Sequence, residues 1–458
     1  MRYSPEPETD RSLRHSVRDG VAHSVMLGGG EIYFSAFALF LKATTAQIGL
    51  LASLPPLLGS FAQILSAWLG HLTGKRKTII VAGAGLQAFI WLPLVILPLY
   101  FTDHAATLLI AFVIIYYAAA GLAAPQWASL MGDLVPERRR GRFFGRRNLL
   151  ASATSFAALV LAGLVLHHFD GDKQTLIGFL IIFTVAMLAR SISVYHLTRM
   201  TDPGGHTAAM EIPVERSLWQ RMWHSPFARF TMFFALMQAA VAVASPFFTL
   251  YMLRDLKFSY LEFMANTATS VMLQVITLNA WGRISDTFGN RAILRITGFT
   301  IPLLPALWLL STNFWYLMLV QVLGGLMWAG FSLSAGNFFY DLVPSGKRAT
   351  YLAVHNVIAS IGIFVGASIG AWLGTTLPTS MSLGQWQGDW HSPLLGVFLI
   401  SALLRLLVAS VFLPHLKEVR EVRPLSTSGL MFRIARYNAL SGLVFDVMGR
   451  RRSSQKRQ

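Results

Sequence analysis

Long apolar stretches of about twenty residues follow one another along the chain, separated by short polar connections. A membrane-spanning helix needs about 20 mostly apolar residues, whereas a helix on a soluble protein is apolar on one face only. Apolar residues make up 54% of the chain and charged residues 13%, about half the share found in soluble domains. The sequence therefore predicts an all-α integral membrane protein.

Twelve apolar stretches can be assigned, in two groups of six. They lie near 20–41, 47–70, 78–101, 106–132, 148–168 and 174–197, then near 228–252, 259–282, 292–312, 314–341, 349–376 and 392–414. These boundaries predict an N-terminal segment 1–19, a six-helix bundle 20–197, a linker 198–226, a second six-helix bundle 227–414 and a tail 415–458.

Most of the 38 lysine and arginine residues fall in alternate connections and at both ends of the chain. Basic connections include GKRK at 74–77, PERRRGRFFGRR at 136–147 and PSGKR at 344–348. Because basic loops remain in the cytoplasm, we expect both termini to be cytoplasmic, in a bacterial inner membrane. The net charge of +17 is then explained by orientation in the membrane, and nucleic acid is not expected as a partner.

The tail has apolar residues at 430, 434, 437, 440 and 444, with arginines between them. This spacing predicts an amphipathic helix on the anionic lipids of the inner leaflet. No cofactor is expected, because no nucleotide-binding motif is present and the chain contains no cysteine. His167 and His168, near Asp170 and Asp172, suggest a metal site, but a solvated loop is the simpler interpretation, and we predict no metal.

A sequence repeat relates the two groups of six. The first copy reads DLVPERRRGRFFGRRN (133–148) and the second reads DLVPSGKRATYLAVHN (341–356). Identical residues lie at equal separation along the chain, namely Asp133 and Asp341, Pro136 and Pro344, Arg140 and Arg348, and Asn148 and Asn356. The repeat predicts two halves related by an axis along the membrane normal.

A weaker repeat follows the second and eighth stretches, in AWLGHLTGKRK (67–77) and AWGRISDTFGNR (280–291). The later copy has the form G-x-x-x-D-x-x-G-x-R through Gly282, Asp286, Gly289 and Arg291, and the earlier copy lacks the aspartate. With twelve spans and a long central linker, this motif resembles the loop signature of the major facilitator superfamily. The resemblance covers about 20–414 and implies secondary transport by alternating access.

Glu31, in SVMLGGGEIYFSAFALF, is an acidic residue in the middle of the first span. A charge at that depth costs about 2.5–3.5 kcal/mol on the insertion scale, so we expect Glu31 to face the bundle interior or a watery cavity. A low dielectric favours the neutral acid, and this predicts a proton- or cation-coupling carboxylate. The alternative is a hydrogen-bonded glutamate that packs the first helix on a neighbour. Gly28–Gly30 before it permit close packing or a helix break.

The resemblance implies that helices one, four, seven and ten line a central cavity. On that basis Tyr117, Gln238 and Trp328 join Glu31 as predicted cavity residues, although each also suits a packing role. One acid among amides and aromatics suits a neutral, cationic or amphipathic solute. Anionic solutes are less expected, because Arg190 and Arg405 are assigned inside or near the ends of spans and no arginine or lysine is expected at mid-membrane.

The repeated loops predict a cytoplasmic gate. By pseudo-symmetry Asp286 is expected near the start of the fifth span, where arginines cluster and a helix N-terminus favours a carboxylate. The alternative is that these loops only fix the topology. The predicted gate residues are Gly282, Asp286, Gly289, Arg291, Asp133, Arg140, Asp341 and Arg348.

The leading hypothesis is a monomeric secondary transporter of a small solute, coupled to protons or another cation through Glu31. A drug or lipid exporter of the same fold is an alternative. A membrane enzyme is less favoured because it needs several convergent reactive groups, and Glu31 alone does not supply them. A non-transporting sensor is less favoured because the sequence offers no separate soluble domain.

Overall fold

The computed structural model describes residues 6–100, 104–135, 140–171, 174–203, 225–343, 348–378, 380–383, 386–389 and 392–418. The first half contains α1 (Pro7–Gly29), η1 (Glu31–Tyr33), α2 (Phe34–Phe40), α3 (Thr45–Thr73), α4 (Arg76–Tyr100), α5 (Ala105–Leu134), α6 (Arg140–His168) and α7 (Thr175–Thr198). The second half contains α9 (Pro226–Ala242), α10 (Phe247–Leu250), η3 (Tyr251–Asp255), α11 (Tyr260–Phe288), α12 (Asn290–Thr300), α13 (Leu303–Leu307), α14 (Phe314–Leu342), α15 (Arg348–Thr376), β1 (Ser380–Leu383), β2 (Trp386–Asp389), α16 (Leu394–Phe412) and η5 (Leu413–His415).

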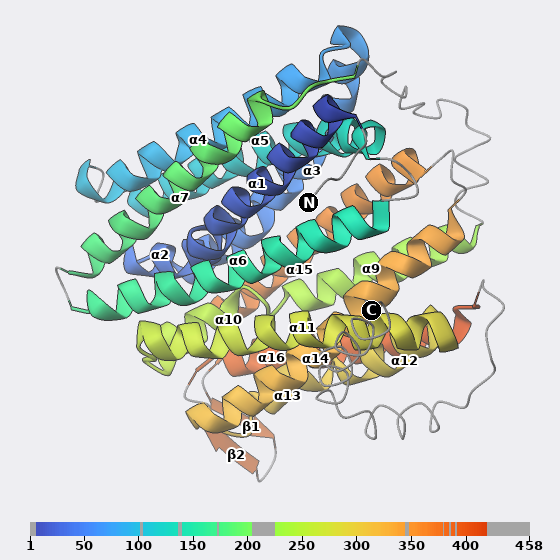
Figure 1. Ribbon diagram of the computed structural model, residues 1–458. Helices are drawn as coiled ribbons and strands as arrows, with labels where there is room; N and C mark the ends of the chain where they lie inside the picture. The colour runs from blue at the N-terminus through green and yellow to red at the C-terminus, as the bar shows by residue number, and fades with distance from the viewer. Residues whose placement is uncertain are drawn as a thin grey trace, which may run out of the picture.

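In the described ranges, 9 helices are long and apolar enough to cross a membrane. Three further segments complete the predicted set, namely α1 with η1 and α2, α11, and α12 with α13. The helices run side by side, with the N-terminal half in the upper part of Figure 1 and the C-terminal half in the lower part. The predicted all-α, twelve-span membrane fold is confirmed, with one short antiparallel hairpin, β1–β2, between α15 and α16.

The first helix of each half is interrupted part-way along its length. In the first half α1 ends at Gly29, Gly30 leaves the helical region at φ −122° and ψ −65°, and η1 follows with Glu31. In the second half α9 ends at Ala242, and a turn through 243–246 precedes α10. Irregular backbone at membrane depth is stable only where protein or water satisfies its polar groups, so both breaks point to the interior of the bundle.

The first helix begins at Pro7, well before the start of the apolar stretch at residue 20. Proline at the first helical position and two acids in the first turn favour a helix start there. The polar side chains of this added segment are buried by pairing with α7 and the residues after it. For example, Ser12 Oγ lies 2.5 Å from Thr201 Oγ1. The sequence prediction missed this extension because hydropathy does not register polar groups that are satisfied by distant partners.

Small residues bring the helices of each half into close contact. A Cβ added to Gly28 would lie 2.0 Å from the carbonyl oxygen of Ser155 on α6, so a larger residue would not fit at this position. In the second half a Cβ added to Gly366 on α15 would lie equally close to the carbonyl oxygen of Ala239 on α9. The two contacts join corresponding helices, the first and fifth of each half, and the repeat in the sequence is therefore also a repeat in packing.

The two halves meet at one end of the molecule. We call the basic end the one where α3 turns into α4 and α11 turns into α12, and the other the opposite end. One apolar core at the opposite end draws residues from both halves, among them Phe37, Ile48, Phe247 and Phe263. Two further apolar cores lie toward the basic end, and the described residues of each come from one half only. The structure is therefore closed at the opposite end.

Candidate functional site

Glu31 lies in η1, at the break in the first helix, and its side chain is partly exposed. The Tyr116 hydroxyl donates to Oε2 at 2.6 Å, and the Tyr117 hydroxyl donates to Oε1 at 2.8 Å. The two tyrosines are consecutive on α5, so their side chains diverge, and the carboxylate lies between them. Each oxygen accepts a hydrogen bond from a hydroxyl, an arrangement that suits the ionised acid. The protonated acid would gain one O–H donor and keep its carbonyl oxygen as an acceptor.

Aromatic rings cover the carboxylate site on its inner side. Phe34 lies edge-on to Tyr116 with ring centroids 5.6 Å apart, and it stacks on Trp91 at 5.2 Å. Trp91 is fully buried, and its Nε1 has no hydrogen-bond partner among the described residues. Glu31 thus sits between an apolar, closed side and a partly exposed side.

The structure brings together only part of the predicted cavity set. Tyr117 contacts Glu31, as described above, but Gln238 lies on α9 and Trp328 on α14, in the other half. Both are partly buried, and no described contact joins either to Glu31. Trp328 instead packs edge-on to Phe331, with ring centroids 5.7 Å apart. Sequence reasoning missed Tyr116 as a partner of Glu31, because adjacent tyrosines cannot be ranked without the helix orientation.

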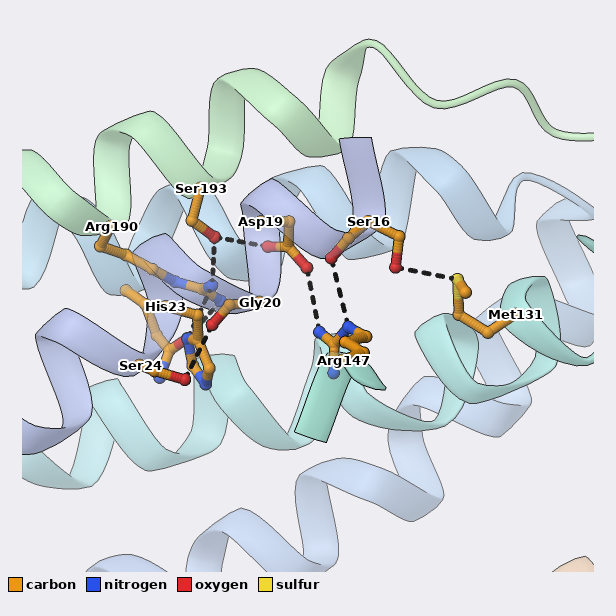
Figure 2. Close-up of polar contacts among 10 residues, drawn as sticks. Ser16, Asp19, Gly20, His23, Ser24, Met131, Arg147, Arg190 and Ser193 are labelled. Atoms are coloured by element: carbon orange, nitrogen blue, oxygen red, sulfur yellow. Dashed lines mark hydrogen bonds and ion pairs between the residues drawn. The ribbon is translucent and has the colours of Figure 1, made fainter. Parts of the chain in front are cut away.

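A second polar cluster lies on α1 between Glu31 and the basic end (Figure 2). Asp19, 4% exposed, accepts a hydrogen bond of 2.7 Å from the Ser193 hydroxyl of α7. Its other oxygen pairs with Arg147 of α6 at 3.3 Å. The Nε of Arg147 donates to the carbonyl oxygen of Ser16 at 3.2 Å, and its guanidinium lies 4.4 Å from the ring centroid of Trp127. Arg147 belongs to the run of arginines near the start of the fifth span, and in this structure it is held inside the first half.

Arg190 of α7 forms the inner part of the same cluster. Its guanidinium donates to Ser193 Oγ at 2.8 Å and to Gln87 Oε1 at 2.6 Å, and it lies 3.0 Å from His23 Nδ1 (Figure 2 shows Arg190, Ser193 and His23). Arginine can only donate, so His23 Nδ1 accepts and the imidazole is neutral with its proton on Nε2. Protonation of His23 would therefore break this contact.

The structure buries two arginines in the interiors of their helices, Arg190 and Arg405. Arg190 is 5% exposed and lies eight residues before the end of α7, about 12 Å along a helix that crosses a core of about 30 Å. Arg405 on α16, the last helix of the second half, is 2% exposed. It donates to Ser401 Oγ at 3.1 Å and to the carbonyl oxygens of Val241 and Ile301, near the breaks in the neighbouring helices. Acceptors on neighbouring helices receive hydrogen bonds from both buried guanidinium groups, although Arg190 Nε has no partner among the described residues, and hydropathy cannot reveal such acceptors.

The predicted gate aspartates bind within their own halves. Asp133 pairs with the buried Arg76 of α4 at 2.5 Å, and Asp202 pairs with the same guanidinium at 2.7 Å. In the second half Asn290, the first residue of α12, donates to Asp341 at 2.9 Å. In each half, the DLVP aspartate thus binds the start of the helix that follows the Gly74 or Gly289 turn. These contacts anchor one helical hairpin in each half.

Other gate residues lie at the same end. Gly289 caps α11 with φ +82°, a conformation that favours glycine, and the backbone N–H of Arg291 donates to Glu418 at 2.8 Å. Gly282 lies within α11, where an added Cβ would reach Leu333 at 4.0 Å. The side chains of Asp286, Arg140 and Arg348 lie outside the described part of the structure, as do the central linker from 204 to 224 and the tail from 419 onward.

At the opposite end, Arg254 of η3 lies 3.4 Å from Thr45 Oγ1 of α3, a polar contact between the halves. Arg254 also pairs with Asp255 at 2.6 Å, and the Ser392 hydroxyl donates to the same carboxylate at 2.5 Å. Among the residues that the structure describes, no group of three or more His, Asp or Glu side chains is placed to hold a metal ion.

Comparisons with known proteins place this geometry in a family. A family model described as MFS_1 like family matches residues 27–382. No curated protein sequence matches the chain. Among solved structures, a D-xylose-proton symporter aligns with a TM-score of 0.67 at 14% identity, covering 90% of this chain and 98% of that one. The nucleoside transporter NupG aligns with a TM-score of 0.63 at 14% identity, covering 90% and 100%.

The xylose transporter XylE from E. coli, in a partially occluded inward open conformation, aligns with a TM-score of 0.64 at 12% identity, covering 92% of this chain and 100% of that one. These structures share the fold with the present protein across nearly its whole length. The family model covers well over half of the sequence and includes both breaks, Glu31 and the DLVP repeat. The chain therefore belongs to the MFS_1 like family, within the major facilitator superfamily of membrane transporters.

Proposed function

We propose that the protein is a secondary active transporter that moves a small solute by alternating access and couples this movement to protons at Glu31. The observation that carries the proposal is the placement of this carboxylate. It lies at a helix break in mid-membrane, accepts from two tyrosine hydroxyls, and remains partly exposed while the opposite end is closed. A group that exchanges protons during transport needs both a buried and a reachable side.

Coupling to another cation is the second possibility at the same site. A metal-like cation needs several oxygen ligands, and the described surroundings of Glu31 provide two tyrosine hydroxyls besides its own carboxylate. A proton needs only the carboxylate. This comparison favours the proton.

Glu31 and Tyr117 supply the polar groups of the proposed solute cavity in the first half, and Gln238 and Trp328 supply those in the second. An acid, an amide and aromatic faces suit a neutral, cationic or amphipathic solute. The similar solved structures include proteins described as transporters of nucleosides and of D-xylose, and both solutes are neutral and polar. A drug or lipid exporter of the same fold is the alternative, and it would need a larger apolar surface in the cavity.

The remaining assignments concern orientation, location and oligomeric state, and the charge pattern supports the first two. Both termini and the basic end face the cytoplasm, the tail contacts anionic lipid, and the protein works as a monomer in a bacterial inner membrane. The loop that contains Gly282, Asp286, Gly289 and Arg291, with the arginines near 140 and 348, closes the basic end when the opposite end opens. In this view the structure represents the inward-facing state.

The proposal is tested in two stages. A thermal-shift screen of nucleosides, sugars, amines and amphipathic cations first identifies a solute that stabilises purified protein. Uptake of that solute is then measured in proteoliposomes with and without a pH gradient. We expect the gradient to stimulate uptake by the wild type, and Glu31→Gln to bind the solute but to lose this stimulation.

Tyr117→Phe is the matched variant, because it removes one hydrogen bond and keeps the acid. We expect it to retain a response to the gradient. If Glu31→Gln transports with the wild-type dependence on the gradient, the coupling role of Glu31 is wrong. If no gradient, of protons or of Na⁺, affects uptake in the wild type, the protein is not a secondary active transporter of that solute.

A further inference from the structure

The cluster around Arg190 lies on the same helix as Glu31, between Glu31 and the basic end. Asp19 and His23 are one helical turn apart on α1, and Glu31 follows two turns after His23, about 12 Å along the helix. The partner helices of the cluster, α6 and α7, both pack along α1. Asp19, His23 and Glu31, which are several helical turns apart on α1, thus lie in one interior region of the first half.

Charges within this cluster do not balance. Its described side chains include two guanidinium groups, those of Arg147 and Arg190, and one carboxylate, that of Asp19. His23 is neutral, because it accepts from Arg190. Arg147 pairs directly with Asp19, whereas Arg190 reaches Asp19 only through the Ser193 hydroxyl. The uncompensated positive charge is therefore that of Arg190.

Arg190 lies near enough to act on Glu31 without touching it. Ala186, one turn before Arg190 on α7, packs against Gly30, the residue before Glu31. This contact places the charge of Arg190 about 10 Å from the carboxylate, given the rise of a helix. In a buried region salt screens the interaction between two such charges far less than at a surface.

We propose that Arg190, held in place by His23, Gln87 and Ser193, is the fixed cation that sets the proton affinity of Glu31. It acts as a positioning residue through its charge, and it is not itself a proton carrier. The titratable and charged groups that face Glu31 are Tyr116 and Tyr117 from α5 and Arg190 from α7. Farther along α1 toward the basic end lie His23 and Asp19, and Asp19 pairs with Arg147 from α6. The inference rests on the proposed function, because it concerns the same carboxylate.

The second half contains a natural comparison. Arg405 occupies the corresponding last helix and is equally buried, but its described hydrogen bonds go to a serine hydroxyl and to backbone carbonyl oxygens. No carboxylate contacts it in the described part of the structure. Arg405 therefore serves as a control for the loss of a buried arginine without the loss of a charge near Glu31.

The test follows protonation of Glu31 directly and needs no solute. Protein in lipid nanodiscs is titrated from pH 4 to pH 10, and the carboxylic acid C=O band is recorded by infrared spectroscopy. The Glu31 contribution is the difference between each protein and the same protein that also contains Glu31→Gln. This difference gives a midpoint pH for Glu31 in every background.

Two substitutions should move this midpoint in opposite directions. Arg190→Gln removes the cation, so the midpoint should rise by about one pH unit, a tenfold change in proton affinity expected for unit charges about 10 Å apart. Asp19→Asn leaves both arginines uncompensated, so the midpoint should fall, by about a threefold change or more in proton affinity. Arg190→Lys and Arg405→Gln should leave it near the wild-type value.

A purely structural role for Arg190 does not produce shifts of opposite sign. Midpoints that stay fixed, or that move the same way in Arg190→Gln and Asp19→Asn, would overturn the inference and leave the coupling role of Glu31 standing. If the wild type shows no Glu31 band between pH 4 and pH 10, both the coupling role and the inference fail. If Arg190→Gln does not fold, Asp19→Asn alone tests the inference. A Glu31 midpoint that stays constant or rises in Asp19→Asn contradicts the proposal.

Discussion

Gly163 lies on α6, where this helix meets α11 of the other half, and it offers a direct test of which state the structure represents. A Cβ added to Gly163 would stand 2.2 Å from Met264 Cγ, 2.5 Å from Met264 Cβ and 2.9 Å from the Tyr33 hydroxyl oxygen. The Cβ of Met264 cannot move independently of its backbone. Gly163→Ala therefore forces α6 and α11 apart.

The magnitude follows from where this contact exists. Forcing extra atoms into a packed interior typically costs about 1–3 kcal/mol. The Met264 contacts join the two halves, so their cost falls on the state closed at the opposite end and not on a state in which the halves have separated there. The longer contact with Tyr33 lies within the first half and is common to both states. The equilibrium should shift by about 5–150-fold toward opening of the opposite end.

The absence of cysteine makes the measurement simple, because two introduced cysteines are the only labelling sites. Tyr100 and Leu310, both highly exposed at the opposite end, are replaced by cysteine and spin-labelled, and the distance distribution is measured in nanodiscs. We expect Gly163→Ala to add or enlarge a long-distance population. Gly145→Ala, on the same helix with no atom within 4 Å of the added Cβ, is the control.

An unchanged distribution in Gly163→Ala, or the same change in Gly145→Ala, would refute the argument that the α6–α11 contact defines this state. A lower melting temperature without a change in distances would place the strain within one half instead. These outcomes separate a shift between states from a loss of stability.

Three further predictions concern the packing and the ion pairs. Gly366→Ala should lower the unfolding free energy by about 1–3 kcal/mol without changing the label distances, because its Cβ would meet the carbonyl oxygen of Ala239 within the same half. Arg76→Gln should lower the unfolding free energy by about 3 kcal/mol, the low end for a buried pair, because Asp133 is 43% exposed and stays partly hydrated; Arg14→Gln should cost about 0–1 kcal/mol, because the Arg14 side chain that pairs with the buried Asp10 is itself 53% exposed. Asp286→Asn should favour the inward-facing state, measured as faster labelling of a cysteine at the basic end, and unaltered labelling would remove Asp286 from the gate.

The membrane fold could be predicted from the sequence because lipid imposes a minimum length on every span and tolerates few charges within it. The halves could be predicted because DLVP recurs in the same register. The start of the first helix could not, because Asp10, Ser12 and Asp19 are polar in the sequence and are buried only through pairing within and beyond α1. Hydropathy assigns such residues to water.

Only part of the candidate site could be predicted, because hydropathy marks an isolated acid but does not reveal partners that are distant in the sequence. Glu31 stands out because an acid among apolar residues needs an explanation, whereas Arg190 at the later part of its span resembles an interfacial arginine. Besides Ser193 on its own helix, its acceptors come from α1 and α4, and no local pattern links these distant segments to α7. The sequence predicted a gate role for the DLVP aspartates but could not show their partners, and the structure pairs each with its own hairpin.

The arrangement of the apolar cores has a mechanical consequence. Each half has a core of its own toward the basic end, and a third core at the opposite end is shared. Under a pulling force applied to the two ends of the chain, the shared core should rupture first, and each half should then yield as a separate cooperative unit. Force spectroscopy on single molecules in a bilayer should accordingly record two main unfolding steps, each able to refold while the other half remains extended.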